Sequence, residues 1–160
     1  MEWWQHNWGN VASAVGLVIS MFAWRRAQRA SEAAKRALAA QHQRTLAAEL
    51  RSCSEKVMSV AKRCRSSDWL GAGDEADEVL QRISIAQNRW KDQLVDNRSK
   101  DELNLIVGHL GVVAGQVRRF SSLGSTEEQA TALDRALNLI MRKLAAEVGK
   151  HEHAVEKFTE

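Results

Sequence analysis

Arg36 and His42 are the two residues of this 160-residue sequence whose types and spacing most resemble a catalytic pair. An arginine can stabilise a negatively charged reacting group, and a histidine can transfer a proton to or from a reacting oxygen, so these two residue types could act together in acid–base chemistry. Five residues separate Arg36 from His42, and such a spacing arises readily by chance in a sequence rich in arginine. Both residues also lie shortly after an apolar segment. We therefore expect two solvated helix residues in a protein that is not an enzyme, with a nuclease as an alternative.

The other histidines and the two cysteines indicate no metal or cofactor site. His151 and His153 are two residues apart, so on a helix they point to nearly opposite sides, as expected for a solvated polar tail. His109 lies in an apolar segment and is expected to be a hydrogen-bonded core residue. Cys53 and Cys64 are too far apart on one helix to form a disulfide, and we expect them to fill a packed face. We predict no metal and no cofactor, because the sequence contains no phosphate-binding loop and no paired-cysteine motif.

An apolar run with a tryptophan at each end, Trp8–Trp24, is the clearest structural signal. It contains no ionisable residue, and as a helix it would be roughly 25 Å long at about 1.5 Å per residue, close to the thickness of a bilayer core. Indole rings favour the headgroup boundary, and Arg25, Arg26 and Arg29 follow at once. The sequence predicts one transmembrane helix, with the amino end outside and the carboxyl side in the cytoplasm of a bacterial inner membrane. A core helix of a soluble domain would explain neither the tryptophans nor the charge step.

Small residues recur every four positions within this run, at Ala12, Gly16 and Ser20. Small side chains at this spacing let helices approach closely in lipid, where packing drives association. We therefore predict a homo-oligomer.

Charge is distributed unevenly along the chain. Residues 25–66 carry eleven Lys or Arg against three Glu, a net charge of +8, whereas residues 67–160 carry twelve against sixteen acids, a net charge of −4. The positive charge lies directly behind the apolar run instead of over a folded face, so it predicts contact with anionic lipid headgroups and no direct nucleic-acid binding.

The composition predicts an all-α fold, because proline is absent and alanine, leucine, glutamate, arginine and glutamine recur throughout. We expect three parts: a tail and transmembrane helix at 1–24, a basic juxtamembrane stalk helix at 25–66, and a small cytosolic helical bundle at 67–160. Turns are expected at residues 66–75, with Asp74 as a helix cap, at residues 96–102, and at residues 124–128, with Ser125 and Glu128 as a capping box.

Two segments are predicted to form an interface between copies of the chain. In the stalk, apolar residues alternate at spacings of three and four, a pattern that either a coiled coil or packing within one bundle produces. In the bundle, three glycines lie opposite a large apolar stripe, so we expect a bundle helix or a neighbouring subunit to approach them closely. The residues are Leu46, Leu50, Cys53, Val57, Val60 and Cys64 in the stalk, and Gly108, Gly111 and Gly115 in the bundle.

The layout of residues 8–42, together with the Arg36–His42 spacing, resembles the small single-span, HEPN-like membrane pore proteins that accompany RNA-targeting CRISPR systems. The resemblance implies a homo-oligomeric pore that acts in antiviral defence.

We expect a non-enzymatic, self-assembling inner-membrane protein that acts as an effector or a sensor, with a pore in phage defence as one form. Its expected partners are the lipid membrane and further copies of itself, and a cytosolic protein or a nucleotide signal is a further candidate. The alternatives are a passive membrane-anchored scaffold for a cytosolic partner and a membrane-tethered ribonuclease of the HEPN type.

Overall fold

The computed structural model describes the backbone of residues 2–91, 94 and 96–159, and the side chains of residues 13, 15–91, 94 and 96–157. This part of the chain contains four α-helices and no strand: α1 (Glu2–Arg65), α2 (Trp69–Trp90), α3 (Asn97–Leu123) and α4 (Glu127–Thr159). The predicted all-α class is therefore confirmed. No proline interrupts the backbone hydrogen bonds within these helices.

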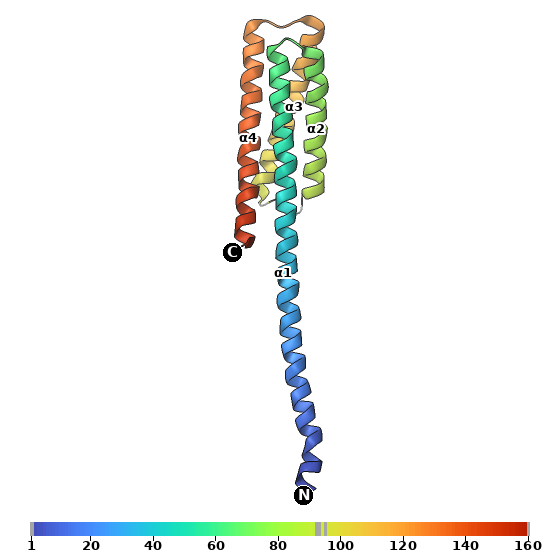
Figure 1. Cartoon of the computed structure of the whole chain (residues 1–160). Helices are drawn as coiled ribbons and strands as arrows, with labels where there is room; N and C mark the ends of the chain where they lie inside the picture. Colours follow the sequence, from blue (N-terminus) through green and yellow to red (C-terminus); the bar gives the residue numbers. More distant parts are fainter. Residues whose placement is uncertain (1, 92–93, 95, 160) are drawn as a thin grey trace. The chain divides into compact units, whose positions relative to one another are not determined.

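The chain divides into two compact units, Met1–Ala39 and Ala40–Glu160. The first unit consists of the amino-terminal part of α1. The second is a bundle in which the remainder of α1 lies beside α2, α3 and α4 (Figure 1). The turn from α1 to α2 and the turn from α3 to α4 lie at the same end of this bundle, where both line one hollow.

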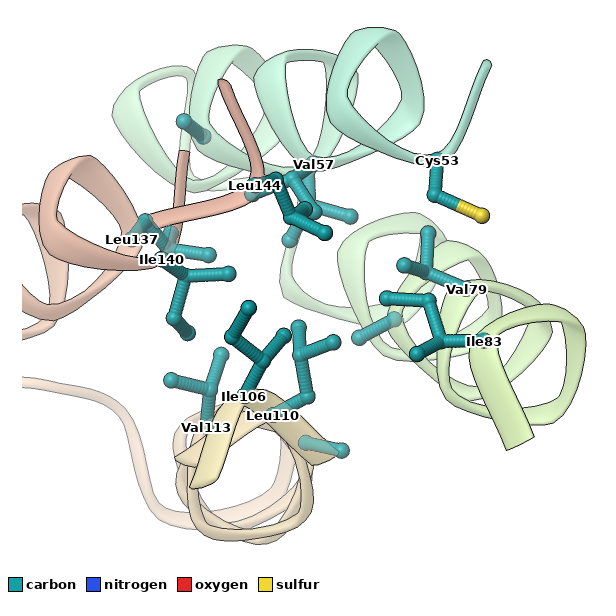
Figure 2. Packing of buried hydrophobic residues seen from close by; sticks show 14 of the residues in the cluster. Cys53, Val57, Val79, Ile83, Ile106, Leu110, Val113, Leu137, Ile140 and Leu144 are labelled. Carbon is teal, nitrogen blue, oxygen red and sulfur yellow. The ribbon is translucent and has the colours of Figure 1, made fainter. Parts of the chain in front are cut away.

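One apolar core fills the bundle. Side chains from all four helices point into it, among them Val57, Ile83, Ile106 and Leu144 (Figure 2). Each of these four residues is fully buried. Apolar residues spaced by three and four within 103–117 of α3 and 133–144 of α4 supply much of this core, because residues at this spacing share one face of a helix.

The first turn of the bundle differs from the prediction. Asp68 caps α2, and its carboxylate accepts a hydrogen bond from the Gly71 N–H at 3.1 Å and another from Arg63 Nη1 at 2.6 Å. A Cβ on Gly71 would lie 2.5 Å from Asp68 Oδ2, so glycine makes room for the cap. Asp74 is therefore not the cap, and Gly71 belongs to the first turn of the helix instead of to the connecting turn.

The cap of α4 lies one residue later than predicted. Gln129 N–H donates to Thr126 Oγ1 at 3.3 Å, and Thr126 N–H donates to Gln129 Oε1 at 3.0 Å. This reciprocal pair is a capping box. The capping box is therefore formed by Thr126 and Gln129, and the predicted pair of Ser125 and Glu128 is wrong. The sequence did not distinguish the two pairs, because each has a hydroxyl side chain three residues before a Glu or Gln.

The seam predicted as a stalk interface packs within a single chain. It lies in Ala40–Glu160, the unit that also contains α2, α3 and α4, and all its members are buried. The chain's own helices cover this face, so it does not present an interface to a second copy. The residues are Leu46, Leu50, Cys53, Val57, Val60 and Cys64.

Among the residues that the structure describes, no helix has a segment both long enough and apolar enough to cross a membrane.

Candidate functional site

The apolar segment in the first unit exposes its large side chains. From Val15 to Trp24, seven large apolar residues have exposed fractions between 46% and 68%, with Leu17 the highest and Trp24 at 61%. An apolar surface of this kind, contiguous and uncovered, marks a site that contacts a membrane or another protein. Trp8 and Ala12, predicted as an anchor and as part of the small-residue stripe, have side chains outside the described residues.

Basic residues follow this segment on the same helix. Arg25, Arg26 and Arg29 are exposed, and together with Ile19 and Phe22 they line a shallow groove. Apolar and cationic side chains thus meet along one surface. Gly16 and Ser20 are also exposed, and a Cβ on Gly16 would meet no atom within 4 Å. The structure therefore leaves accessible those predicted anchor and stripe residues whose side chains it describes, namely Trp24, Arg25, Arg26 and Arg29, and Gly16 and Ser20.

Arg36 and His42, the predicted catalytic candidates, belong to different units. Arg36 is exposed in Met1–Ala39, whereas His42 lies in Ala40–Glu160. The His42 ring packs against the Trp90 indole, with the ring centroids 5.4 Å apart and the planes tilted by 53°. The Trp90 indole N–H in turn donates to Glu49 Oε2 at 2.9 Å, and Arg89 binds Glu49 Oε1 at the same distance. His42 therefore has a packing role between α1 and α2.

A buried polar cluster lies between α1 and α4. The His151 ring is fully buried, and its Nδ1–H donates to Gln43 Oε1 at 2.6 Å. Glu147 is also buried and forms an ion pair with Lys150. Two buried atoms, His151 Nε2 and Glu147 Oε2, have no partner among the described residues. Sequence reasoning missed this cluster.

Burial controls the protonation of this cluster. Desolvation lowers the pKa of His151, because the charged imidazolium would lose its hydration, and the nearby Glu147 carboxylate partly opposes that shift. His151 is therefore neutral near pH 7, with a proton on Nδ1 that is hydrogen-bonded to Gln43 Oε1.

The predictions for His151 and His109 are wrong. The polar tail is not solvated throughout: α4 continues to Thr159 and buries His151, whereas His153 is exposed and binds Glu156 at 2.9 Å. The available signal was the spacing of Leu144, Val148 and His151, which continues the apolar stripe of α4. His109, predicted in the core, is exposed instead.

The two cysteines are buried and free, and they pack among core residues. Burial raises the pKa of each thiol, Cys53 and Cys64, to about 11. Because the thiolate is the reactive form, neither side chain is suited to nucleophilic chemistry. Within the described residues, no group of three His, Cys, Asp or Glu side chains could hold a metal ion.

The glycines of α3 lie on an open face. A Cβ on Gly108, Gly111 or Gly115 would meet no atom within 4 Å, so no helix of the bundle approaches them closely. Leu105 and Val112 are exposed on the same face, at 50% and 61%. The prediction that a bundle helix approaches these glycines closely is therefore wrong. The alternative, that a second copy of the chain does so, stays a prediction.

The chain matches no protein-family model, and no curated protein or solved structure is significantly similar to it. The function must therefore be argued from these surfaces.

Proposed function

We propose that this chain is a non-enzymatic, self-assembling protein of the bacterial inner membrane. Residues 1–24 anchor it as a single pass with the amino end outside, and the Ala40–Glu160 bundle works on the cytoplasmic side as an effector or a sensor. A pore active in phage defence is the form that the family resemblance implies.

One observation carries the proposal: the exposed apolar surface of Val15–Trp24, with Arg25, Arg26 and Arg29 directly behind it. Exposing such a surface to water is unfavourable at about 25 cal/mol for each Å² of apolar area, so it requires a cover. A bilayer covers all sides of a helix at once, and arginines after the apolar run favour the cytoplasmic side. Self-assembly is supported by the exposed small residues Gly16 and Ser20.

The alternative role, an adaptor that holds a cytosolic partner at the membrane, is supported by the open face of α3 around Gly108 and Val112. The ribonuclease alternative is not adopted, because the His42 ring packs on the Trp90 indole.

Fractionation of cells that express single-arginine variants tests the anchor. The wild-type chain is expected in the membrane fraction and resistant to alkaline carbonate. Val15→Arg and Ile19→Arg each place a charge near the middle of the apolar segment, at a cost of about 2.5–3.5 kcal/mol, and are expected to release the protein. Leu123→Arg is the matched control, because Leu123 is 84% exposed in the bundle. A wild-type chain that carbonate extracts completely would refute the anchor.

A fusion of alkaline phosphatase to the carboxyl terminus tests the orientation. The enzyme is expected to be inactive, since it folds only in the periplasm and the bundle is proposed to be cytoplasmic. An active fusion would invert the topology.

A further inference from the structure

Two bulky apolar residues and three arginines between residues 19 and 29 share one face of α1. Arg25, Arg26 and Arg29 follow Phe22 by three, four and seven positions, and these spacings place side chains on the same face of a helix. Ile19 precedes Phe22 by three positions and joins this face, so the groove that these residues line is apolar at one end and cationic at the other.

The small-residue stripe lies on a different side of the helix. Ser20 and Phe22 are two positions apart, so their side chains point in nearly opposite directions. A neighbouring copy packed against Gly16 and Ser20 would therefore leave the face of Phe22 and Arg26 free for lipid.

The cations of the first unit lack acidic partners. Among the described residues, no ion pair or hydrogen bond involves the side chains of Arg25, Arg26 or Arg29, and Glu32 is the sole acid between residues 15 and 39. In the bundle, by contrast, several exposed cations are paired, as in Arg51–Glu152 at 2.5 Å and Arg65–Asp134 at 2.8 Å. These three guanidinium groups lie within two helical turns and beside an apolar surface, so they are available to anions from outside the chain.

We propose that this face is a binding site for anionic phospholipid. Acyl chains lie along Ile19 and Phe22, while Arg25, Arg26 and Arg29 bind the phosphate and the remaining headgroup oxygens. Guanidinium suits this role, because its planar fork of donors matches phosphate oxygens in a bidentate manner. The site rests on the proposed membrane anchor. A free phosphate ion would use the same arginines but could not use the apolar end of the groove, so the lipid is the ligand that fits the whole face.

Fluorescence quenching by brominated lipids tests this site in the full-length chain. Phe22→Trp places the reporter on the face of the arginines, when Trp24 and the three tryptophans before it are replaced by phenylalanine. Emission from Trp69 and Trp90 of the bundle is subtracted by means of a matched variant that keeps Phe22. The protein is reconstituted in phosphatidylcholine vesicles containing the same fraction of either brominated phosphatidylglycerol or brominated phosphatidylcholine. Each arginine near an anionic surface contributes a factor of roughly five to binding, so we expect selective quenching by phosphatidylglycerol of at least about fivefold.

The variant Arg25→Gln/Arg26→Gln/Arg29→Gln is expected to lose this selectivity and keep its quenching by brominated phosphatidylcholine. The matched control, Arg119→Gln/Arg135→Gln/Arg142→Gln, removes the same charge from the bundle and should keep the selectivity. High salt is expected to weaken the selectivity by screening, and dissolved inorganic phosphate at equal ionic strength should not compete further.

The outcomes separate the two proposals. Equal quenching of the wild-type chain by both lipids would refute the lipid site and leave the anchor intact. Quenching by neither lipid would refute the anchor itself. Selectivity that survives in the triple variant, or that inorganic phosphate abolishes, would show that these arginines do not bind the lipid as proposed.

Discussion

The two units of this chain use the same helix-forming residues in opposite ways. In Ala40–Glu160, large apolar side chains are buried and many cations are matched to acids, whereas in Met1–Ala39 the described apolar side chains and the cations are exposed and unmatched. A stripe at a spacing of three and four lets one helix bury its apolar face against three others. An apolar surface on all sides of a helix has no such solution within the chain. The bundle therefore buries its apolar side chains within the chain, whereas the first unit needs a cover from outside the chain.

Truncating a core residue should give the largest effect. Leu110→Ala removes a fully buried side chain, and a cavity of this kind costs about 2–5 kcal/mol in the free energy of unfolding. Leu17→Ala, at a position that is 68% exposed, should change the unfolding of the bundle by less than about 0.5 kcal/mol. Urea denaturation followed by circular dichroism measures both. Equal losses would show that the first unit contributes to the bundle's core.

The sequence predicted the buried stripes well because burial repeats with the helix period. Ile106, Leu110 and Val113 are all buried, and their positions follow from the spacing of apolar residues alone. The caps were less predictable, because Asp68 and Asp74 both offer a carboxylate before a helical stretch, and the choice depends on where Arg63 lies in space. Such a contact between residues of different helical turns has no periodic signal.

The polar cluster and the seam show two further limits of sequence reasoning. His151 lies near the carboxyl end in a segment rich in charged residues, which is typical of a solvated tail. Its burial depends on Gln43, which is more than a hundred positions away in the chain, so the local sequence does not reveal it. The apolar pattern of the seam from Leu46 to Cys64 is compatible with a coiled coil between chains and with packing inside one bundle. Only the arrangement of α2, α3 and α4 decides between the two. The exposure of Gly108 likewise depends on which helices lie beside α3.

An intermediate effect is expected from acid, through His151. The charged groups around this ring are Glu147 and Lys150 on α4 and Asp96 at the cap of α3, while Gln43 on α1 accepts a hydrogen bond from Nδ1–H. Burial lowers the pKa in the folded state below the unfolded value of about 6.5, so the unfolded chain binds the proton more readily. The contribution of neutral His151 is complete above about pH 6.5 and is lost as the pH falls toward the lowered pKa.

Unfolding measured from about pH 7 down to about pH 5 tests this dependence. His151→Gln keeps a donor for Gln43 and cannot titrate, so it should lose less stability over this range than the wild-type bundle. His153→Gln removes an exposed histidine and should follow the wild-type curve. If both variants respond to acid as the wild type does, His151 does not control the stability of the bundle in this range.

The smallest effects are expected on the open face of α3, the part of the bundle that most resembles the uncovered first unit. Glycine in a helix costs about 1 kcal/mol relative to alanine, and a Cβ at Gly108 or Gly115 meets nothing in the chain. Gly108→Ala and Gly115→Ala should therefore each stabilise the bundle by about 0.5–1 kcal/mol in urea denaturation. A loss of stability would show that the chain itself needs glycine there.

Larger substitutions on this face decide whether it contacts a second copy. Gly108→Leu/Gly115→Leu should leave the bundle folded, since the added side chains enter open space, but should block close approach of another helix. Gly16→Leu should do the same in the first unit, where packing between helices in lipid depends on small residues. Mass photometry in detergent measures the assembly, and Gly149→Leu, also in open space on α4, is the matched control. Loss of assembly in Gly16→Leu alone would assign self-association to the first unit and leave the α3 face for a different partner, whereas a monomeric wild-type chain would refute self-assembly at both faces.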